Sequence, residues 1–415
     1  MDPKTYSKEE HGINVDDIDA HALYVLDKLR LAGHQAYLVG GGVRDLLLGI
    51  KPKDYDISTS AKPEEVKKLF RNCLLIGRRF RLAHVRFGRK IIEVATFRAG
   101  DTEDESLIIR DNIFGTPEED VLRRDFTING LFYDSEKEHV IDFVEGYPDI
   151  KKRFLRTIGQ SFVRFKQDPV RMIRLIKFVA RFGLDADPEA RQALLECRAE
   201  ILKSAQARVL EEMLRMLESG SSAPFFKLMA EHGLLEQIMP TLAEFLETPE
   251  GGDVYSYLEE LDRSNHEPHH PKYARATLVA AFIFPLFEMR LKTHFLDREK
   301  TPHLGDIFEE AHALIDDIFK PFFLFPKRIR AQVTSILVNQ YRITPFDPKR
   351  KTRIRIPIDP DFFQTLDFLK LRVSLKPTLS PIYDQWREAF EKGEKPLPRS
   401  SSGTKRNRPR RRKKS

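Results

Sequence analysis

The chain has 415 residues, of which 41% are hydrophobic, enough apolar material for two or three domains with buried cores. Two cysteines exclude a disulfide framework, and the polar first dozen residues exclude a signal peptide. The longest apolar run, residues 278–287, is too short to span a bilayer. We therefore expect a cytoplasmic protein without membrane contact. The net charge is +7, but residues 399–415 hold nine Lys or Arg and no acid, which leaves the first 398 residues at −2 (7 − 9) and excludes a body that binds polyanions over its whole surface.

A glycine-rich turn follows the first predicted strand. Apolar residues recur at helical spacing over residues 15–31, and the run at residues 37–39 predicts a buried strand. Three glycines at residues 40–42 come next, and then an amphipathic helix is expected at residues 43–48. Glycine leaves the backbone open to a ligand, and the start of a helix favours an anion, so this turn suits a phosphate.

Two aspartates, Asp54 and Asp56, follow the glycine turn. Positions two apart on a strand face the same side, so both carboxylates would reach the same metal ions beside bound phosphates. A Walker loop is excluded because Gly-Lys-Ser/Thr is absent, and a dinucleotide fingerprint is excluded because Asp45 stands where it needs glycine. The pattern therefore favours a nucleotidyltransferase, and a solvated strand face is the alternative.

The stretch Leu38-Val-Gly-Gly-Gly-Val-Arg-Asp-Leu-Leu-Leu-Gly49 with Asp54-Tyr-Asp56 resembles the first motif of the family that contains bacterial poly(A) polymerases and tRNA CCA-adding enzymes. The resemblance implies a polymerase-β-type head, a small mixed sheet with helices. With the all-α neck and body that the helical patterns predict and the disordered basic tail that composition predicts, we expect an α+β protein. The resemblance also implies nucleotide contacts by Gly40, Gly41 and Arg44. The expected divisions are a flexible N-terminus (1–15), a nucleotidyltransferase head (16–150), a helical neck (151–217), an all-α RNA-binding body (218–395) and a basic tail (396–415).

A basic turn beside Gly77 contains Arg78, Arg79 and Arg81. Arginines in this setting suit contacts to the phosphates of the triphosphate or of an RNA end, and a solvated loop is the alternative. The segment Ile76-Gly-Arg-Arg-Phe-Arg-Leu-Ala-His-Val85 resembles the pattern that separates the poly(A) polymerase branch from its CCA-adding relatives. We expect His84 to be structural.

A third carboxylate is expected at Glu93, on the predicted strand at residues 91–97. By period two it shares a face with apolar neighbours, and an acid among buried apolar residues needs a partner. The aspartate pair with its metal ions would supply one, and an ion pair with Arg98 or another base is the alternative. The resemblance implies that Glu93 is the third metal-binding acid.

The stretch Asp-Val-Leu-Arg-Arg-Asp-Phe-Thr-Ile-Asn-Gly at residues 120–130 resembles a second family motif, which lies around the sugar and phosphates. The resemblance implies that Arg123 and Arg124 meet phosphate. Asp125, which we group with the catalytic residues, and Asn129 would bond ribose hydroxyls or orient the arginines. An ion pair between Asp125 and one of its neighbouring arginines is the structural alternative.

A long helix is predicted from Asp168-Pro169 to residue 182, because an Asp cap and a first-turn proline precede it and Gly183 ends it. Basic residues recur every three positions along it, either as an exposed stripe or as a surface that recognises a base. The resemblance implies that Asp168 and Arg171 form a template for the incoming base, and helix capping is the rival role of Asp168. The expected nucleotide contacts of the neck are Asp168, Arg171, Arg174 and Arg208.

Beyond residue 217 the resemblance thins to a hydrophobic pattern that predicts helices, among them residues 224–232, 278–291, 305–318 and 327–338. The basic tail would gather RNA phosphates through salt-sensitive counterion release, and a merely solubilising role is the alternative. The tail arginines that we expect to bind RNA are Arg406, Arg410, Arg411 and Arg412.

The sequence thus predicts a template-independent enzyme that adds AMP from ATP to RNA 3′ ends and releases pyrophosphate. Asp54, Asp56 and Glu93 would hold two Mg²⁺ ions. The expected partners are ATP, RNA 3′ ends and RNA-decay proteins, and we expect a monomer. The alternatives are a CCA-adding tRNA nucleotidyltransferase and a non-catalytic RNA-binding protein, and the preference for ATP rests on the resemblance alone.

Overall fold

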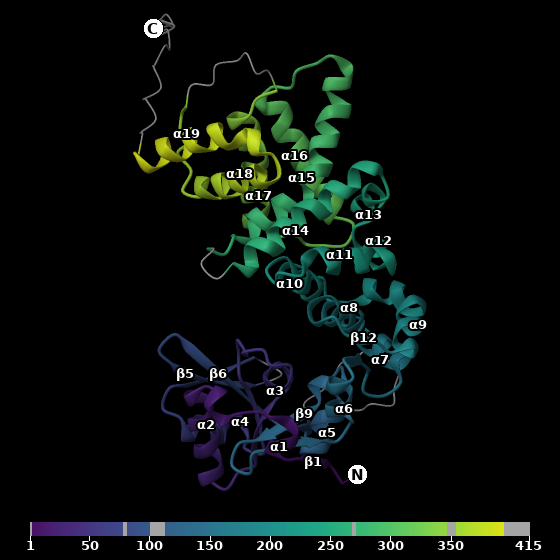
Figure 1. The fold of residues 1–415 in the computed structure, drawn as a ribbon, viewed down its shortest axis with the longest axis vertical. Helices are drawn as coiled ribbons and strands as arrows, with labels where there is room; N and C mark the ends of the chain where they lie inside the picture. The colour runs from purple at the N-terminus through teal and green to yellow at the C-terminus, as the bar shows by residue number, and fades with distance from the viewer. Residues whose placement is uncertain (1, 78–80, 100–112, 268–270, 347–353, 394–415) are drawn as a thin grey trace, which may run out of the picture.

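The computed structural model describes residues 2–77, 81–99, 113–267, 271–346 and 354–393. The described chain is elongated, with a sheet-containing head at one end and helices along the rest of its length (Figure 1). This agrees with the α+β architecture that the sequence predicts. In the described residues, no helix is long and apolar enough to cross a membrane.

The head is built on an eight-stranded mixed sheet in the order β1-β10-β9-β2-β3-β6-β5-β4. Strands β3 and β6 pair in parallel, and every other neighbouring pair is antiparallel. In sheet order the strands are β1 (Lys4–Tyr6), β10 (His139–Asp142), β9 (Leu131–Asp134), β2 (Ala36–Val39), β3 (Asp56–Thr59), β6 (Lys90–Thr96), β5 (Leu82–Phe87) and β4 (Cys73–Ile76).

One face of this sheet is apolar and covered by helices. Helices α2 and α4 contact the strands of that face, where Leu38, Ile57 and Val94 are buried. Because side chains alternate along a strand, Asp56 and Glu93 lie on the opposite face. The head helices are α1 (Lys8–His11), α2 (Ala20–Leu31), α3 (Gly41–Leu47), α4 (Pro63–Leu69), α5 (Pro117–Leu122) and α6 (Gly146–Lys151), and a small ribbon pairs β7 (Arg98–Ala99) with β8 (Ile113–Phe114).

The first fifteen residues differ from the flexible segment that the sequence predicted. Strand β1 pairs with β10 at the edge of the sheet, and α1 follows it directly. The ring of Tyr6 packs on Tyr147 with a centroid distance of 4.0 Å, and the buried His11 contacts the ring of Tyr133. Two ring side chains among the exposed charges, Tyr6 and His11, hold the segment against the head, which its polar composition did not indicate.

The neck consists mainly of helices: α7 (Ser161–Gln167), α8 (Val170–Phe182), α9 (Pro188–Cys197) and α10 (Gln206–Leu217). A two-stranded parallel sheet of β11 (Phe154–Leu155) and β12 (Asp185–Ala186) also lies here. The sequence predicted a purely helical neck, and the structure differs in this short sheet. Helix α8 ends as the sequence indicates, because Gly183 takes a left-handed conformation with φ of 60°.

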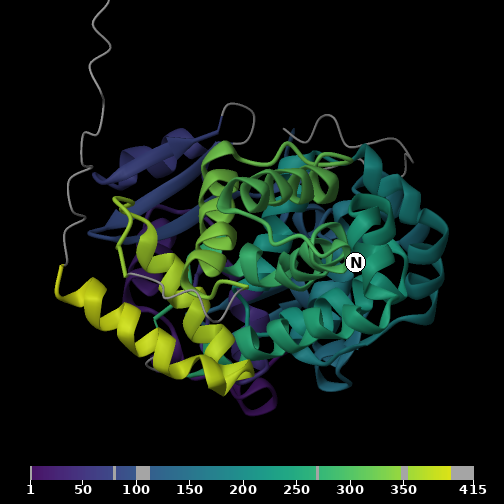
Figure 2. The same cartoon turned by 90° about the horizontal axis from the view of Figure 1, so that it is seen from above.

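The body is all-helical in its described residues, and seen from above its green and yellow helices lie in front of the purple and blue head (Figure 2). Helix α15 packs against α14, α16, α17 and α18. Residues 276–287 of α15 are buried, which explains why this helix is apolar on all sides and tolerates Pro285 in its interior. The body helices are α11 (Ser222–Glu231), α12 (Leu234–Ile238), α13 (Pro240–Leu246), α14 (Gly252–His266), α15 (Arg275–His294), α16 (Leu304–Phe319), α17 (Lys327–Ile343), α18 (Phe362–Leu375) and α19 (Ser380–Glu391).

Candidate active site

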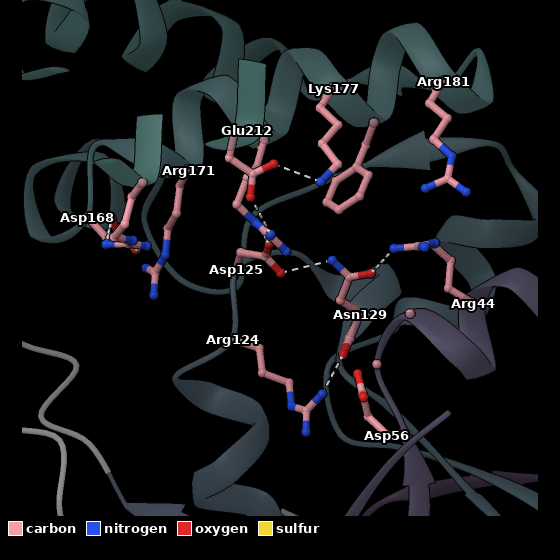
Figure 3. A pocket seen from close by; sticks show the side chains of 15 residues that line it. Arg44, Asp56, Arg124, Asp125, Asn129, Asp168, Arg171, Lys177, Arg181 and Glu212 are labelled. Carbon is pink, nitrogen blue, oxygen red and sulfur yellow. Dashed lines mark hydrogen bonds and ion pairs between the residues drawn. The ribbon is translucent and has the colours of Figure 1, made fainter. Parts of the chain in front are cut away.

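A cavity of about 450 Å³ lies between the head and the neck (Figure 3). We call it the head–neck cavity. It brings together most of the site residues that the sequence predicted, and it adds four that were not predicted. The head contributes Gly40, Gly41, Arg44, Asp56, Arg124, Asp125 and Asn129, and the neck contributes Asp168, Arg171, Arg174, Lys177, Phe178, Arg181, Arg208 and Glu212.

The wall of this cavity is positively charged. Among the described residues, seven Arg or Lys and four Asp or Glu line it, a formal excess of three positive charges (7 − 4). Two guanidinium nitrogens, Arg124 Nε and Arg171 Nη1, are buried there without a hydrogen-bond partner in the described chain. A buried unpaired donor is costly, so the cavity suits an anion rich in acceptor oxygens, such as a polyphosphate.

The glycine turn is tighter than the sequence predicted. Helix α3 already begins at Gly41, so two of the three glycines belong to the helix and Gly40 alone makes the turn, with φ of +63°. A Cβ at Gly40 would lie 3.0 Å from Arg124 Nη1. Glycine is therefore required at position 40 both for its backbone conformation and for the close approach of that arginine.

Arg124 is held in place by three head residues. Its guanidinium bonds Asp120 Oδ2 at 2.8 Å, Ser58 Oγ at 3.3 Å and the Asn129 carbonyl at 3.2 Å. Arg123 pairs with the same buried Asp120 at 2.7 Å and is not among the residues that line the cavity. Sequence reasoning missed Asp120, although its spacing of three and four residues from the two arginines is a recognisable helical pattern.

Asp125 pairs with an arginine of the neck rather than with its sequence neighbours. Its carboxylate accepts hydrogen bonds from Arg174 Nε at 2.6 Å and from Asn129 Nδ2 at 2.9 Å. Desolvation alone would raise the pKa of Asp125, but the charge of Arg174 and these hydrogen bonds outweigh it and hold the pKa well below its usual range. The alternative of a structural ion pair is thus observed, with Arg174 as the partner.

The same network continues to Arg44. The Asn129 side chain accepts a hydrogen bond from Arg44 Nη1 at 2.7 Å, and Arg44 also bonds Asp45 at 2.6 Å. The Arg44 guanidinium lies over the rings of Phe178 and Phe182 in α8, 5.0 and 4.6 Å from their centroids. Arg44 therefore joins the glycine turn to the neck, in addition to lining the cavity.

Arginines of the neck also donate hydrogen bonds to main-chain carbonyls of the head. The buried Arg164 donates through Nη2 to the carbonyls of Leu122 and Arg124, at 3.2 and 2.7 Å. Arg171 donates to the Arg123 carbonyl at 3.0 Å. These bonds fix the loop that carries the second motif against α7 and α8.

The three predicted metal-binding carboxylates lie near one another at the sheet, but not as the sequence predicted. Asp56 is the first residue of β3, and its register partner in β6 is Glu93. Asp54 precedes the strand and lines a neighbouring cavity instead, so the period-two argument does not apply to it. Desolvation and then the charges of Glu93 and Asp54 raise the pKa of Asp56 to about 6, which shows that the three groups interact.

Glu93 occupies an open strand face, contrary to the buried face predicted for it. Its side chain is 48% exposed, and its neighbour Ile91 is 42% exposed. The base that it contacts is His84, whose Nε2 lies 3.4 Å from Glu93 Oε1 and which is its register partner in β5. An exposed acid beside Asp56 is accessible to an ion or substrate without any rearrangement of the sheet.

The chemistry of the carboxylates and the repulsion between them both favour binding of Mg²⁺. Carboxylate oxygens are its preferred protein ligands, and a divalent cation would offset the repulsion that raises the pKa of Asp56. In the described part of the chain, no three His, Cys, Asp or Glu side chains converge as a complete metal-binding cluster. Mg²⁺ is commonly held by one or two carboxylates plus substrate phosphates, so an incomplete protein cluster is compatible with that ion.

Asp168 does not act as the helix cap that the sequence offered as one of its roles. Its two carboxylate oxygens accept hydrogen bonds from Arg208 Nη1 and Nη2 at 3.0 and 2.9 Å, and α8 has no side-chain cap in the described structure. This bidentate pair lies beside Arg171 at one end of the cavity (Figure 3). The Asp168–Arg208 pair and the unpartnered Arg171 Nη1 therefore lie in the wall of the same cavity.

Four residues of the cavity wall were not predicted as site residues: Lys177, Phe178, Arg181 and Glu212. Glu212 in α10 bridges Lys177 at 2.8 Å and Arg174 at 3.4 Å. The Phe178 ring lies against Arg44, Arg174 and Lys177. Phe178 is not part of the three-residue repeat of basic residues in α8, and Glu212 lies in a different helix, α10. The sequence therefore carried no direct signal that Phe178 and Glu212 belong to the cavity wall.

Of the arginines predicted to bind RNA, the structure describes only Arg81. Arg81 pairs with Glu64 at 2.5 Å and is not among the residues that line the head–neck cavity. The other arginines predicted to bind RNA, which are Arg78, Arg79, Arg406, Arg410, Arg411 and Arg412, lie outside the described residues.

A mixed sheet with acids at a strand start, a glycine turn beside them and a cation-lined cavity together define a nucleotidyltransferase. The family model described as the poly(A) polymerase head domain matches residues 36–156, and one described as a probable RNA and SrmB-binding site of polymerase A matches residues 183–246. Poly(A) polymerase I of Escherichia coli O6:H1 is 38% identical over 387 residues, which are 89% of this chain and 81% of that protein. The chain belongs to the poly(A) polymerase family.

Other relatives extend the comparison. Poly(A) polymerase I of Haemophilus influenzae is 34% identical and covers 90% of this chain and 85% of its own. The CCA-adding enzyme of Lactobacillus delbrueckii is also 34% identical but covers only 54% of this chain and 57% of its own. The crystal structure of the Bacillus stearothermophilus CCA-adding enzyme in complex with CTP has a TM-score of 0.63 at 24% identity, covering 89% of this chain and 82% of its own, which shows a shared fold.

Proposed function

We propose that the protein transfers AMP from ATP to RNA 3′ ends. The observation that carries this proposal is the head–neck cavity. Its wall combines the glycine turn and Asp56 with several arginines, whose positive charge suits a triphosphate. The choice of poly(A) addition over CCA addition is supported by the extent of similarity. Poly(A) polymerase I relatives match 89% of the chain, whereas CCA-adding relatives at similar identity match 54%.

In the proposed reaction, the RNA 3′-hydroxyl oxygen attacks the α-phosphorus of ATP. A bond forms between these two atoms, the bond from the α-phosphorus to the bridging oxygen breaks, pyrophosphate leaves, and the hydroxyl proton passes to solvent. Gly40 and Gly41 leave room for the phosphates against the backbone, and Arg124 neutralises their charge. Asp54, Asp56 and Glu93 would hold two Mg²⁺ ions, which when bound lower the proton affinity of the hydroxyl and stabilise charge on the phosphates.

The nucleotide-incorporation assay tests the proposed activity directly. With Mg²⁺ and a generic RNA, we expect the protein to add many A residues from ATP. Addition of CTP to truncated tRNA, with termination after three nucleotides, would instead identify a CCA-adding enzyme. Absence of incorporation from any nucleotide would leave the non-catalytic RNA-binding alternative.

We further propose that Asp168, Arg171 and Arg208 recognise the adenine base. The Asp168–Arg208 pair is exposed to the cavity, and Arg171 presents a buried nitrogen without a partner. Hydrogen bonds to a base edge discriminate strongly because the wrong base leaves these groups unpaired.

Replacement of Asp168 with Ala is expected to reduce the preference for ATP over CTP. One lost base contact corresponds to a roughly tenfold change in discrimination. The measurement is the ratio of kcat/KM for the two nucleotides, and Glu196→Ala, an exposed acid of α9, is the matched control. An unchanged ratio in the Asp168 variant would assign the carboxylate to positioning Arg208 only.

The wider setting of the enzyme stays a proposal. We propose that it acts in the cytoplasm as a monomer, that RNA-decay proteins are its partners and that the arginine-rich tail binds RNA. The match of residues 183–246 to a probable RNA-binding site of polymerase A supports RNA contact by the neck and the start of the body.

A further inference from the structure

A second cavity, of about 430 Å³, lies where the head, neck and body meet. It shares Lys177 and Arg181 with the head–neck cavity and is therefore adjacent to it. The head contributes Lys53 and Asp54, and the body contributes Lys272 among others. Asp54 is the only residue lining this cavity, among the described residues, that the sequence predicted as a site residue. The sequence therefore assigned no ligand to this cavity.

Three cations that line this cavity lack an ion-pair partner in the described chain. Lys53 of the head, Arg181 of the neck and Lys272 of the body form no ion pair within the described chain. Of the other charged residues of the wall, Lys177 pairs with Glu212 at 2.8 Å, Arg215 with Glu211 at 3.0 Å and Glu218 with Arg275 at 2.7 Å, while Asp54 has no ion pair in the described chain.

Lys53, Arg181 and Lys272 line the same cavity, where they outnumber the one acid without an ion pair in the described chain, Asp54. Such a cluster costs free energy in the empty protein, and a bound anion would offset that cost. Its remaining wall includes the apolar side chains of Met216, Tyr273 and Leu278. The cavity therefore offers both a phosphate-binding corner and an apolar surface.

The carboxylates lie at the boundary between the two cavities. Asp56 lines the head–neck cavity and Asp54 lines the second one. In phosphoryl transfer the attacking oxygen and the leaving group lie on opposite sides of the phosphorus, with metal-binding groups between them. If the glycine turn holds the phosphates of ATP, the acceptor hydroxyl must approach from the side of Asp54.

We propose that this second cavity is the acceptor site, and that Lys53, Arg181 and Lys272 bind the last phosphodiester of the RNA 3′ end. Met216, Tyr273 and Leu278 then provide the surface for the terminal nucleoside. The inference rests on the proposed function, because it places the acceptor relative to ATP. A phosphate of ATP is the other source of the same chemistry, and the experiment separates the two.

The test is a double-mutant cycle between one lysine and one phosphate. The probe is fluorescein-labelled hexaadenylate, either unmodified or with a neutral methylphosphonate as its last internucleotide linkage. Binding is measured by anisotropy without ATP or Mg²⁺, so that the result does not depend on catalysis. The proteins are the full chain, its Lys272→Ala variant, Lys272→Arg as a charge-preserving variant and Lys292→Ala as an exposed-lysine control on α15.

We expect the methylphosphonate to weaken binding to the unmodified chain about tenfold, and Lys272→Ala to weaken binding of normal hexaadenylate by a similar factor. In the Lys272→Ala protein the methylphosphonate should cost little more, because its partner is already absent. Lys272→Arg should retain most of the affinity. Additive losses, or a loss equal to that of Lys292→Ala, would overturn the proposal.

Steady-state kinetics provide the second readout. We expect Lys272→Ala to raise KM for the RNA acceptor about tenfold and to leave KM for ATP unchanged. A rise in KM for ATP without a rise for RNA would assign the cavity to the triphosphate. If the full chain adds no nucleotide, the proposed function fails, while the anisotropy cycle still decides whether this cavity binds an RNA phosphate.

Discussion

Replacement of Asp56 with Asn is expected to reduce the rate of nucleotide incorporation about a thousandfold. This is the scale typical for loss of one electrostatic group at a reacting centre. The change removes a negative charge at the start of β3, beside Glu93 and between the two cavities. It keeps the size of the side chain, so RNA binding measured without Mg²⁺ is expected to remain.

The same substitution is expected to leave the melting temperature unchanged or to raise it. The raised pKa of Asp56, about 6, means that its ionised form is disfavoured in the folded protein by desolvation and by Glu93 and Asp54. Asparagine removes that repulsion. Incorporation of a single nucleotide and a thermal melt test the two effects, with Asp27→Asn, an exposed acid of α2, as the control. Retained activity would remove Asp56 from the mechanism, and a large drop in melting temperature would show a structural role instead.

Replacement of Asp125 with Ala is expected to lower the free energy of unfolding by about 3 kcal/mol, because it leaves a desolvated arginine without its main partner. The Asp125 side chain is 11% exposed and pairs with Arg174 at 2.6 Å across the head–neck junction. Loss of the pair also frees Asn129 and thereby Arg44, so we expect incorporation to fall as well.

The effect of Asp125→Ala depends on pH in a defined direction. The pKa of Asp125 is held below its ordinary value of 3.8 in the folded chain. A depressed carboxyl pKa contributes stability that is fully present above the unfolded value and is lost as pH falls through the folded value. The difference between the unmodified chain and the variant should therefore be constant near neutral pH and should shrink in acid below the usual aspartate range.

Urea denaturation of Asp125→Ala, Arg174→Ala and the double variant measures the pair itself. Residues in direct contact are expected to show a coupling energy of about 2 kcal/mol. Glu212, which also contacts Arg174, provides the matched comparison through Glu212→Ala. Independent effects of the two substitutions would mean that the 2.6 Å contact contributes nothing to the stability of the junction.

The local patterns of the sequence predicted the fold and much of the site. The apolar strand and glycine run predicted β2 and α3, and Asp168-Pro169 and Gly183 predicted α8 up to its final residue, Phe182. These predictions succeed because strand alternation, helix periodicity and glycine conformation depend on neighbours a few residues away. The family resemblance supplied the roles of Asp54, Asp56 and Glu93, which spacing alone left open.

Contacts between distant segments could not be predicted in the same way. The structural alternative for Asp125 was an ion pair with a neighbouring arginine, but the arginine that it meets, Arg174, lies 49 residues away in α8. Asp168 has the local signal of a cap, yet it pairs with Arg208 across 40 residues. Glu212 and Phe178 have no functional pattern of their own and become part of the site only because α8 and α10 pack together. Tertiary packing decides which of several chemically reasonable partners an ionic group meets.

The bonds from Arg164 and Arg171 to carbonyls of residues 122–124 have a consequence for how this enzyme can change over evolutionary time. A carbonyl is common to every amino acid, so the junction recognises the path of the chain and not the identity of its side chains. A substitution at Leu122, whose side chain is exposed, can therefore leave the two modules assembled in the same orientation, whereas Arg124 is constrained by its own side-chain contacts.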